Sequence, residues 1–270
     1  MRTSKGLIVA TAVGLALGLV PTLPFDGSGS PDQQLRVSPN DALRSGIEEL
    51  KGGNKANAAI SLQYAAEHGN EYALWQLAHM YAKGDGVPLD NYRAFEYFQK
   101  FADGNSNINP AAPRARYVSD AFIALGNYYF TGIPNSPVTS NPELGQRMLI
   151  HAASYFGDPE AQYQLARLLL DGKLVSPDPK RAVAWLNQAA YKRHYQAQAV
   201  LGRILFYGEA GQRPQRATGL MWLIIANDGA GANVPWIADL RANALKEATD
   251  KERNEARELL TRWLQGRPPR

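Results

Sequence analysis

The sequence predicts an all-α protein, a right-handed α-solenoid of helix-turn-helix repeats, and three observations lead to this fold class. A twelve-residue pattern occurs four times along the 270-residue chain. Its apolar positions have the spacing of one helix face, and each copy ends in glycine. A second helical pattern follows each copy, so the repeating unit is a helix, a glycine corner and another helix.

The first helix of the unit keeps one register in all four places. The copies begin at residues 73, 121, 161 and 197 and read ALWQLAHMYAKG, AFIALGNYYFTG, AQYQLARLLLDG and AQAVLGRILFYG. Alanine stands first, leucine fifth, and large apolar residues eighth and ninth, positions that share one face of an α-helix. The sixth residue is small, so we expect a neighbouring helix to approach closely at Ala78, Gly126, Ala166 and Gly202.

Each copy closes with a glycine at its twelfth position, where a helix end often needs left-handed backbone. In the first copy the segment Gly84-Asp85-Gly86 could also suggest a phosphate or calcium loop. A phosphate loop opens a helix and usually follows a strand, whereas this segment follows a helix and precedes Pro88. The residues after Asp85 lack the spacing of a calcium loop. We therefore interpret the four glycines as corners: Gly84, Gly132, Gly172 and Gly208.

The second helix has a small residue, an apolar residue three positions later and an alanine four positions after that. Clear copies are Gly145-Met148-Ala152, Ala182-Trp185-Ala189 and Gly219-Trp222-Ala226, and a degenerate copy is Ala59-Leu62-Ala66. In the first full repeat the bulky Phe95 takes the small position. The residues expected to begin these helices are Asp90, Pro142 and Pro179.

The chain divides into a leader and one repeat domain. Residues 1–30 contain Arg2 and Lys5, a short apolar run and a linker rich in Gly, Ser and Pro, which is typical of an export signal. The apolar run is shorter than the about 20 residues of a membrane span. No clear cleavage site follows it, so an uncleaved anchor stays an alternative. We expect a periplasmic protein.

Residues 41–264 are expected to form a single α-solenoid of about five helix pairs plus C-terminal capping helices. Residues 238–264 show an amphipathic pattern, and a solenoid needs a terminal unit with one polar face. The alternative is that this last segment binds a partner.

The repeat resembles the Sel-one-like repeat, a relative of the tetratricopeptide repeat, best in the segments ALWQLAHMYAKGDGVPLDNYRAFEYFQKFADGN and AQYQLARLLLDGKLVSPDPKRAVAWLNQAA. With the leader and the absence of cysteine, the chain is similar to periplasmic negative regulators of exopolysaccharide synthesis in rhizobia and related alphaproteobacteria. That resemblance implies binding to the periplasmic domain of a membrane sensor histidine kinase, which holds a two-component system off. The alternative is a structural scaffold or adaptor in an envelope or polysaccharide-export assembly.

Composition and motifs argue against an enzyme. The absence of cysteine excludes disulfides, thiolate metal sites and cysteine nucleophiles. The four histidines lie in different units without metal-ligand spacing, and no serine-nucleophile motif is present. The net charge of +4 is small, and the Lys and Arg residues are interspersed with Asp and Glu along the chain. This pattern does not indicate a nucleic-acid-binding protein. We predict no catalysis, metal, cofactor, small-molecule substrate or nucleic-acid partner.

The first helices line the concave face of tetratricopeptide-type superhelices, so the resemblance implies a partner-binding row there. The third and seventh positions of the four copies mix aromatic residues with Arg and His, types that dominate protein-binding hot spots. An ordinary solvated helix face is the alternative. The predicted partner-binding residues are Trp75, His79, Asn127, Tyr163, Arg167 and Arg203.

Two insertions, residues 103–120 and 132–142, are rich in Asn and Pro and are expected to be surface loops. One hypothesis is that a loop contacts the partner or is cut by a periplasmic protease, and the alternative is tolerated decoration. The loop candidates are Arg114, Arg116 and Tyr117.

Overall fold

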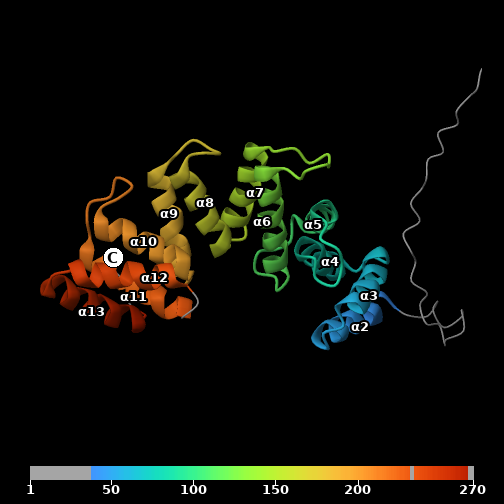
Figure 1. The fold of residues 1–270 in the computed structure, drawn as a ribbon, viewed down its shortest axis with the longest axis horizontal. Coiled ribbons are helices and arrows are strands. Elements are labelled where there is room, and N and C mark those ends of the chain that lie inside the picture. The colour runs from blue at the N-terminus through green and yellow to red at the C-terminus, as the bar shows by residue number, and fades with distance from the viewer. Residues whose placement is uncertain (1–37, 232–233, 267–270) are drawn as a thin grey trace, which may run out of the picture. The chain divides into compact units, whose positions relative to one another are not determined.

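The computed structural model describes residues 38–231 and 234–266, and the regular elements within these ranges are all helices (Figure 1). The chain divides after Ser38, and every described helix belongs to the second unit. The export signal predicted over residues 1–30 lies outside the described residues. The helices are α2 (Pro39–Lys51), α3 (Lys55–Glu67), α4 (Glu71–Lys83), α5 (Asn91–Asn105), α6 (Ala115–Thr131), α7 (Pro142–Ser154), α8 (Pro159–Asp171), α9 (Pro179–Tyr191), α10 (Tyr195–Tyr207), α11 (Arg216–Ala230), α12 (Pro235–Glu247) and α13 (Asp250–Leu264).

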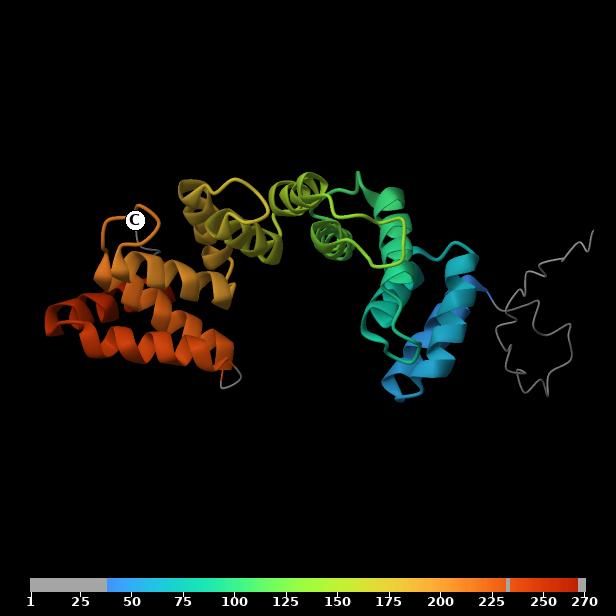
Figure 2. The same ribbon diagram turned by 45° about the horizontal axis from the view of Figure 1, so that its top comes forward.

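The helices pack in chain order, as Figures 1 and 2 both show. Successive helices form pairs, α2 with α3 through α10 with α11, and each pair contacts the next. The last two helices, α12 and α13, both pack on α11. This arrangement confirms the predicted all-α repeat fold. None of the helices in the described ranges combines the length and apolar character needed to traverse a lipid bilayer.

The repeat pattern supplies the core. Every first-position alanine and fifth-position leucine is buried: Ala73, Ala121, Ala161, Ala197, Leu77, Leu125, Leu165 and Leu201. The small positions bring helices together, since a Cβ built on Gly219 would lie 2.5 Å from the Phe206 backbone nitrogen. It would also lie 2.7 Å from the carbonyl oxygen of Gly202. Only glycine allows α10 and α11 to pack this closely.

Helix starts lie where the sequence predicts them. The Asp90 side chain accepts hydrogen bonds from the backbone N–H groups of Tyr92 and Arg93 and so caps α5. Pro142 and Pro179 occupy the first positions of α7 and α9, where a missing N–H costs nothing.

The glycine corners are confirmed, with one variation. Gly84, Gly172 and Gly208 adopt the left-handed conformation just after their helices. Gly132 also has a positive φ of 68°, but its ψ of 175° sends the chain into the insertion. In the first copy a Cβ on Gly86 would lie 2.6 Å from the Lys55 backbone. The Gly-x-Gly segment is thus a corner that rests against the start of α3.

The first insertion is shorter than residues 103–120, because helices enter it from both sides. Helix α5 continues to Asn105, and α6 begins at Ala115, which leaves residues 106–114 as the loop. Ala115 and Val118 are buried, so the apolar face of α6 begins before the repeat pattern does. The second insertion is a loop that turns back on itself, where the Ile133 N–H donates to the Val138 carbonyl at 2.8 Å.

Candidate functional site

The predicted site residues fall into two separate groups. Trp75 and His79 on α4 contact the first turns of α6 through Tyr117 and Asp120. By contrast, hollows beside α8 are lined by Asn127, Tyr163, Arg167 and Arg203. The single row expected from the sequence is therefore divided, and the two groups differ in what their polar atoms do.

The first group is held together by Asp120. The Trp75 indole Nε1–H donates to Asp120 Oδ2 at 2.7 Å, and His79 Nε2 lies 2.7 Å from the same oxygen. The Tyr117 ring packs 4.6 Å from the Trp75 ring. Because the indole N–H and the imidazole Nε2 are both engaged within the chain, this cluster joins one repeat to the next.

Arg116 and Tyr117 are helix residues rather than the loop residues that the sequence suggested, whereas Arg114 is the last residue of the loop. Arg114 immediately precedes α6, and the other two lie in its first turn. Arg114 forms an ion pair with Glu71 at 3.1 Å, and the Arg116 guanidinium lies 4.5 Å from the centre of the Tyr117 ring. Arg114 and Tyr117 line a hollow of about 450 Å³ beside the start of α4.

The second group lines two adjoining hollows that we call the α8 groove. The first, of about 470 Å³, contains Asn127, and the second, of about 380 Å³, contains Arg203. Tyr163, Arg167 and Asp171 line both and so join them. The remaining residues of the groove are Phe130, Leu149, Glu160, Gln164, Leu168, Leu170, Lys173, Val200 and Trp236.

The third position of the repeat is mostly core, which corrects the prediction that it lines a binding face. Tyr163 is only 6% exposed, Ile123 is 7% exposed and Ala199 is fully buried. The Tyr163 ring is covered from the next repeat by His194, whose ring centre lies 4.9 Å away. A partner in the groove therefore meets the seventh positions directly and only a small part of Tyr163.

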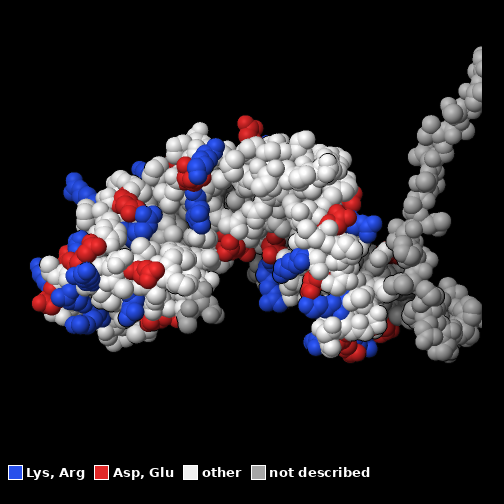
Figure 3. Space-filling model, in the orientation of Figure 1, with Lys and Arg blue, Asp and Glu red and all other residues white. Residues whose placement is uncertain are grey.

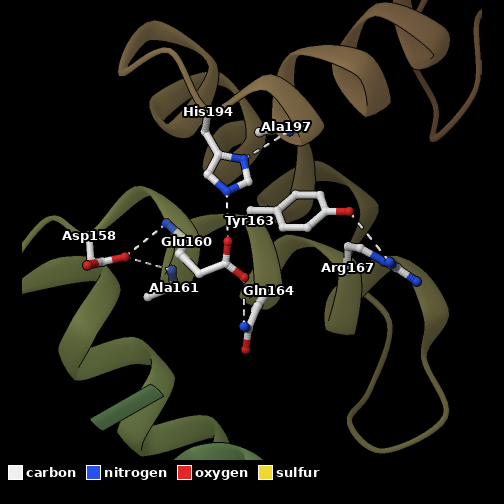
Figure 4. A network of polar contacts seen from close by, with 8 residues as sticks. All are labelled: Asp158, Glu160, Ala161, Tyr163, Gln164, Arg167, His194 and Ala197. Carbon is white, nitrogen blue, oxygen red and sulfur yellow. Dashed lines mark hydrogen bonds and ion pairs between the residues drawn. The ribbon is translucent and has the colours of Figure 1, made fainter. Parts of the chain in front are cut away.

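His194 joins α8 to α10 through a chain of hydrogen bonds (Figure 4). As the N-cap of α10, its Nδ1 accepts from the Ala197 N–H at 3.2 Å, so the proton of the neutral ring lies on Nε2. That Nε2–H donates to Glu160 at 2.8 Å, and Gln164 donates to the other Glu160 oxygen at 2.8 Å. The hydrogen bond from His194 holds the pKa of Glu160 below its usual range.

Arg167 stands apart from these pairs. Its guanidinium lies 5.9 Å from the centre of the Tyr163 ring and 3.5 Å from the Tyr163 hydroxyl. Within the described part of the chain, it has no carboxylate at ion-pairing distance. By contrast, Asp171 pairs with Lys173 at 3.1 Å, and Arg203 pairs with Glu209.

Trp236 is a groove residue to which the sequence analysis gave no role. It is 40% exposed, while its neighbour Ile237 is fully buried. The helical spacing of Ile237 and Ala244, both buried, could have placed Trp236 off the apolar face. Its place in the lining of the second hollow depends on how α12 packs against α10 and could not be derived from that spacing.

One other stretch of the surface has few charged groups. Residues 121–142 contain no Asp, Glu, Lys or Arg, and Figure 3 shows a mostly uncharged surface over α7 and the loop before it. Over the ranges that the structure describes, no group of three or more His, Asp or Glu residues is arranged to hold a metal ion.

Four stretches of the chain match the family model of the Sel1 repeat: residues 71–106, 119–154, 159–194 and 196–229. The chain belongs to the Sel1-repeat family. The Sel1 matches coincide with the helix pairs from α4/α5 to α10/α11. The pair α2/α3 precedes the first Sel1 repeat, and α12 and α13 follow the last.

Two bacterial relatives match this Sel1-repeat chain over most of its length. The exopolysaccharide production negative regulator of Rhizobium leguminosarum bv. viciae is 34% identical, over 93% of this chain and 92% of that protein. The protein of the same name from Rhizobium meliloti (strain 1021) is also 34% identical, with the same coverage of both chains.

A solved structure supports the fold alone. A Sel1 repeat protein from Oxalobacter formigenes superposes with a TM-score of 0.63 at 21% identity, covering 88% of this chain and 90% of that one.

Proposed function

We propose that this protein is an exported negative regulator of exopolysaccharide production. It acts by binding the extracytoplasmic domain of a membrane sensor histidine kinase and keeping a two-component system inactive. The observation that carries the proposal is the match to two exopolysaccharide production negative regulators, at 34% identity over 93% of this chain. Because the match covers 92% of each relative as well, it extends over whole chains rather than over shared repeats.

A binding role is consistent with the surface of the repeat domain. The α8 groove has partly exposed polar and aromatic residues on rigid helices, which suits recognition of a protein. The loop of residues 106–114 is the segment that a periplasmic protease would cut, within this proposal, to end the inhibition.

Gene deletion tests the regulatory role. We expect a deletion strain to secrete more exopolysaccharide, and we expect a plasmid copy of the gene to reverse the effect. Deleting the kinase as well should abolish the overproduction, since the regulator would act through it. Unchanged polymer output would contradict the proposal, and loss of secreted polymer would favour the alternative role as a scaffold of an export assembly.

Export and kinase binding are measured separately. An alkaline phosphatase fused after residue 38 should be active only if the leader carries it across the membrane, and a fusion lacking residues 1–30 is the control. Calorimetric titration of the exported chain with the kinase's extracytoplasmic domain should give saturable binding. A cytoplasmic fusion or an absence of binding would refute the corresponding part of the proposal.

A further inference from the structure

The second hollow of the α8 groove contains one cation without an anionic partner. Its lining holds three charged residues, Arg167, Asp171 and Arg203. Asp171 pairs with Lys173, and Arg203 pairs with Glu209, so each of these pairs is close to neutral. Arg167 alone is left, and its guanidinium donates a long hydrogen bond of 3.5 Å to the Tyr163 hydroxyl. The hollow therefore carries a net positive charge, which belongs to Arg167.

Arg167 is also well positioned for recognition. It projects from the middle of α8, where the buried Tyr163 ring supports its side chain from one turn earlier. Supporting a guanidinium on an aromatic ring reduces the side-chain freedom that binding would otherwise remove. A planar guanidinium fork pairs with a carboxylate through two parallel N–H···O bonds.

The rest of the hollow is apolar. Leu170 and Val200 line it, together with Trp236, which is 40% exposed. A partly exposed tryptophan in the same hollow as arginine side chains is the composition of a protein-binding hot spot. The volume of about 380 Å³ accommodates one or two side chains rather than a folded domain.

We propose that this hollow binds a segment of a protein partner through an aspartate or glutamate side chain held by Arg167, with an adjacent apolar side chain packed against Trp236. This inference deepens the proposed function. It rests on that function for one premise, that the ligand is a protein. Charge complementarity selects the carboxylate, and the apolar wall selects a flanking apolar residue over a second charge.

Selection from random peptides displayed on phage tests this inference without assuming any particular partner. The full-length protein is the bait, in parallel with Arg167→Met. We expect sequences enriched on the wild type to carry Asp or Glu next to a large apolar residue, and we expect this signature to disappear with Arg167→Met. Enrichment without acidic residues, or the same signature on both baits, would overturn the inference.

Synthetic peptides measure how much the carboxylate contributes to the binding affinity. In fluorescence anisotropy, changing the selected Asp or Glu to its amide should weaken binding roughly tenfold to a hundredfold, as expected for a hydrogen-bonded charge pair. Arg167→Met should cause a similar loss and should bind the acid and amide peptides equally. Arg147→Met is the matched control, since Arg147 is an exposed arginine of α7 outside the groove. We expect the Arg147→Met protein to bind the acidic peptide as tightly as the wild type does. Circular dichroism shows whether each variant keeps its helices.

Two further experiments test whether the carboxylate comes from a source other than an Asp or Glu side chain. Peptides with free and amidated C-termini should bind alike, and oligogalacturonate should not compete. Dependence on the free C-terminus, or Arg167-dependent binding of the uronate, would overturn the assignment to a side chain.

The inference and the proposed function can fail separately. Kinase binding that ignores Arg167→Met would leave the regulator role intact and refute this site. Arg167-dependent peptide binding without kinase binding would do the reverse.

Discussion

Single buried polar residues join consecutive repeats at two places, between α7 and α8 and between α9 and α10. Buried Gln162 donates to the Ala153 carbonyl at 3.0 Å, and buried Gln198 donates to the Ala190 carbonyl at 2.9 Å. Both glutamines occupy the second position of the repeat, and each satisfies a carbonyl at the end of the preceding helix. At the second of these places His194 caps α10 and links it to Glu160 of α8. These contacts fix the position of one repeat on the next more specifically than alanine packing can.

Replacing His194 should separate its two roles. His194→Ala removes both the N-cap of α10 and the link to Glu160, so we expect the free energy of unfolding to fall by about 1–2 kcal/mol. His194→Asn keeps a side-chain acceptor for the Ala197 N–H and should lose less. The Glu160 side chain is 45% exposed, so solvent screening keeps the contribution of the His194–Glu160 contact to the free energy of unfolding small.

Urea unfolding followed by circular dichroism measures both variants. Equal losses in the alanine and asparagine variants would mean that the cap contributes nothing.

At the scale of the elements, paired glycines set how closely two helices of a repeat pack. Gly126 faces Gly145 between α6 and α7, and Gly202 faces Gly219 between α10 and α11. A Cβ at any of these four positions would come within 3.1 Å of the opposite backbone. The interface is therefore backbone against backbone, and a single methyl group is enough to separate the helices.

Gly219→Ala should destabilise the protein, although alanine is the better helix former. We expect overpacking to lower the free energy of unfolding by about 1–3 kcal/mol. This loss exceeds the gain of about 1 kcal/mol from the higher helix propensity of alanine. Gly104→Ala in α5 is the matched control, because its nearest contact would be a flexible Glu71 side chain at 3.6 Å. It should be neutral or stabilising.

Thermal unfolding of the two glycine variants and the wild type measures these changes in stability. A Gly219→Ala protein as stable as the Gly104→Ala protein would contradict the close packing of α10 and α11.

The elements themselves could be predicted because each repeat buries the same positions against its own partner helix. The register, the capping residues and the corner glycines all follow from that local periodicity. What the sequence could not predict depends on the next repeat: the burial of Tyr163 under His194, and the capture of Trp75 and His79 by Asp120. Helical spacing says which face is apolar, but not which flank of that face a neighbouring repeat covers.

Across the whole repeat domain, substantial packing is confined to helices close together in the chain. Such a protein behaves as a row of coupled units, in which each repeat is stabilised by its own pair and its neighbours. The terminal units are therefore the weakest unless they are covered. At the C-terminal end α13 supplies the cover, with Trp263 packed 5.0 Å from the buried Trp222 ring and Arg216 paired with Glu252 at 2.8 Å.

Trp263→Ala should loosen the C-terminal repeat and leave the first repeats unchanged. Losing a half-buried indole against Trp222 should cost roughly 2–3 kcal/mol locally, less than for a fully buried one. Because stability in a solenoid passes only between neighbours, the change should fade along the chain. Hydrogen exchange with mass spectrometry should show faster exchange in α11 and α13 and unchanged exchange in α4 and α5. Trp236→Ala removes a tryptophan that is 40% exposed and should change neither region appreciably. Equal acceleration in every helix would instead mean that the domain unfolds as one cooperative unit.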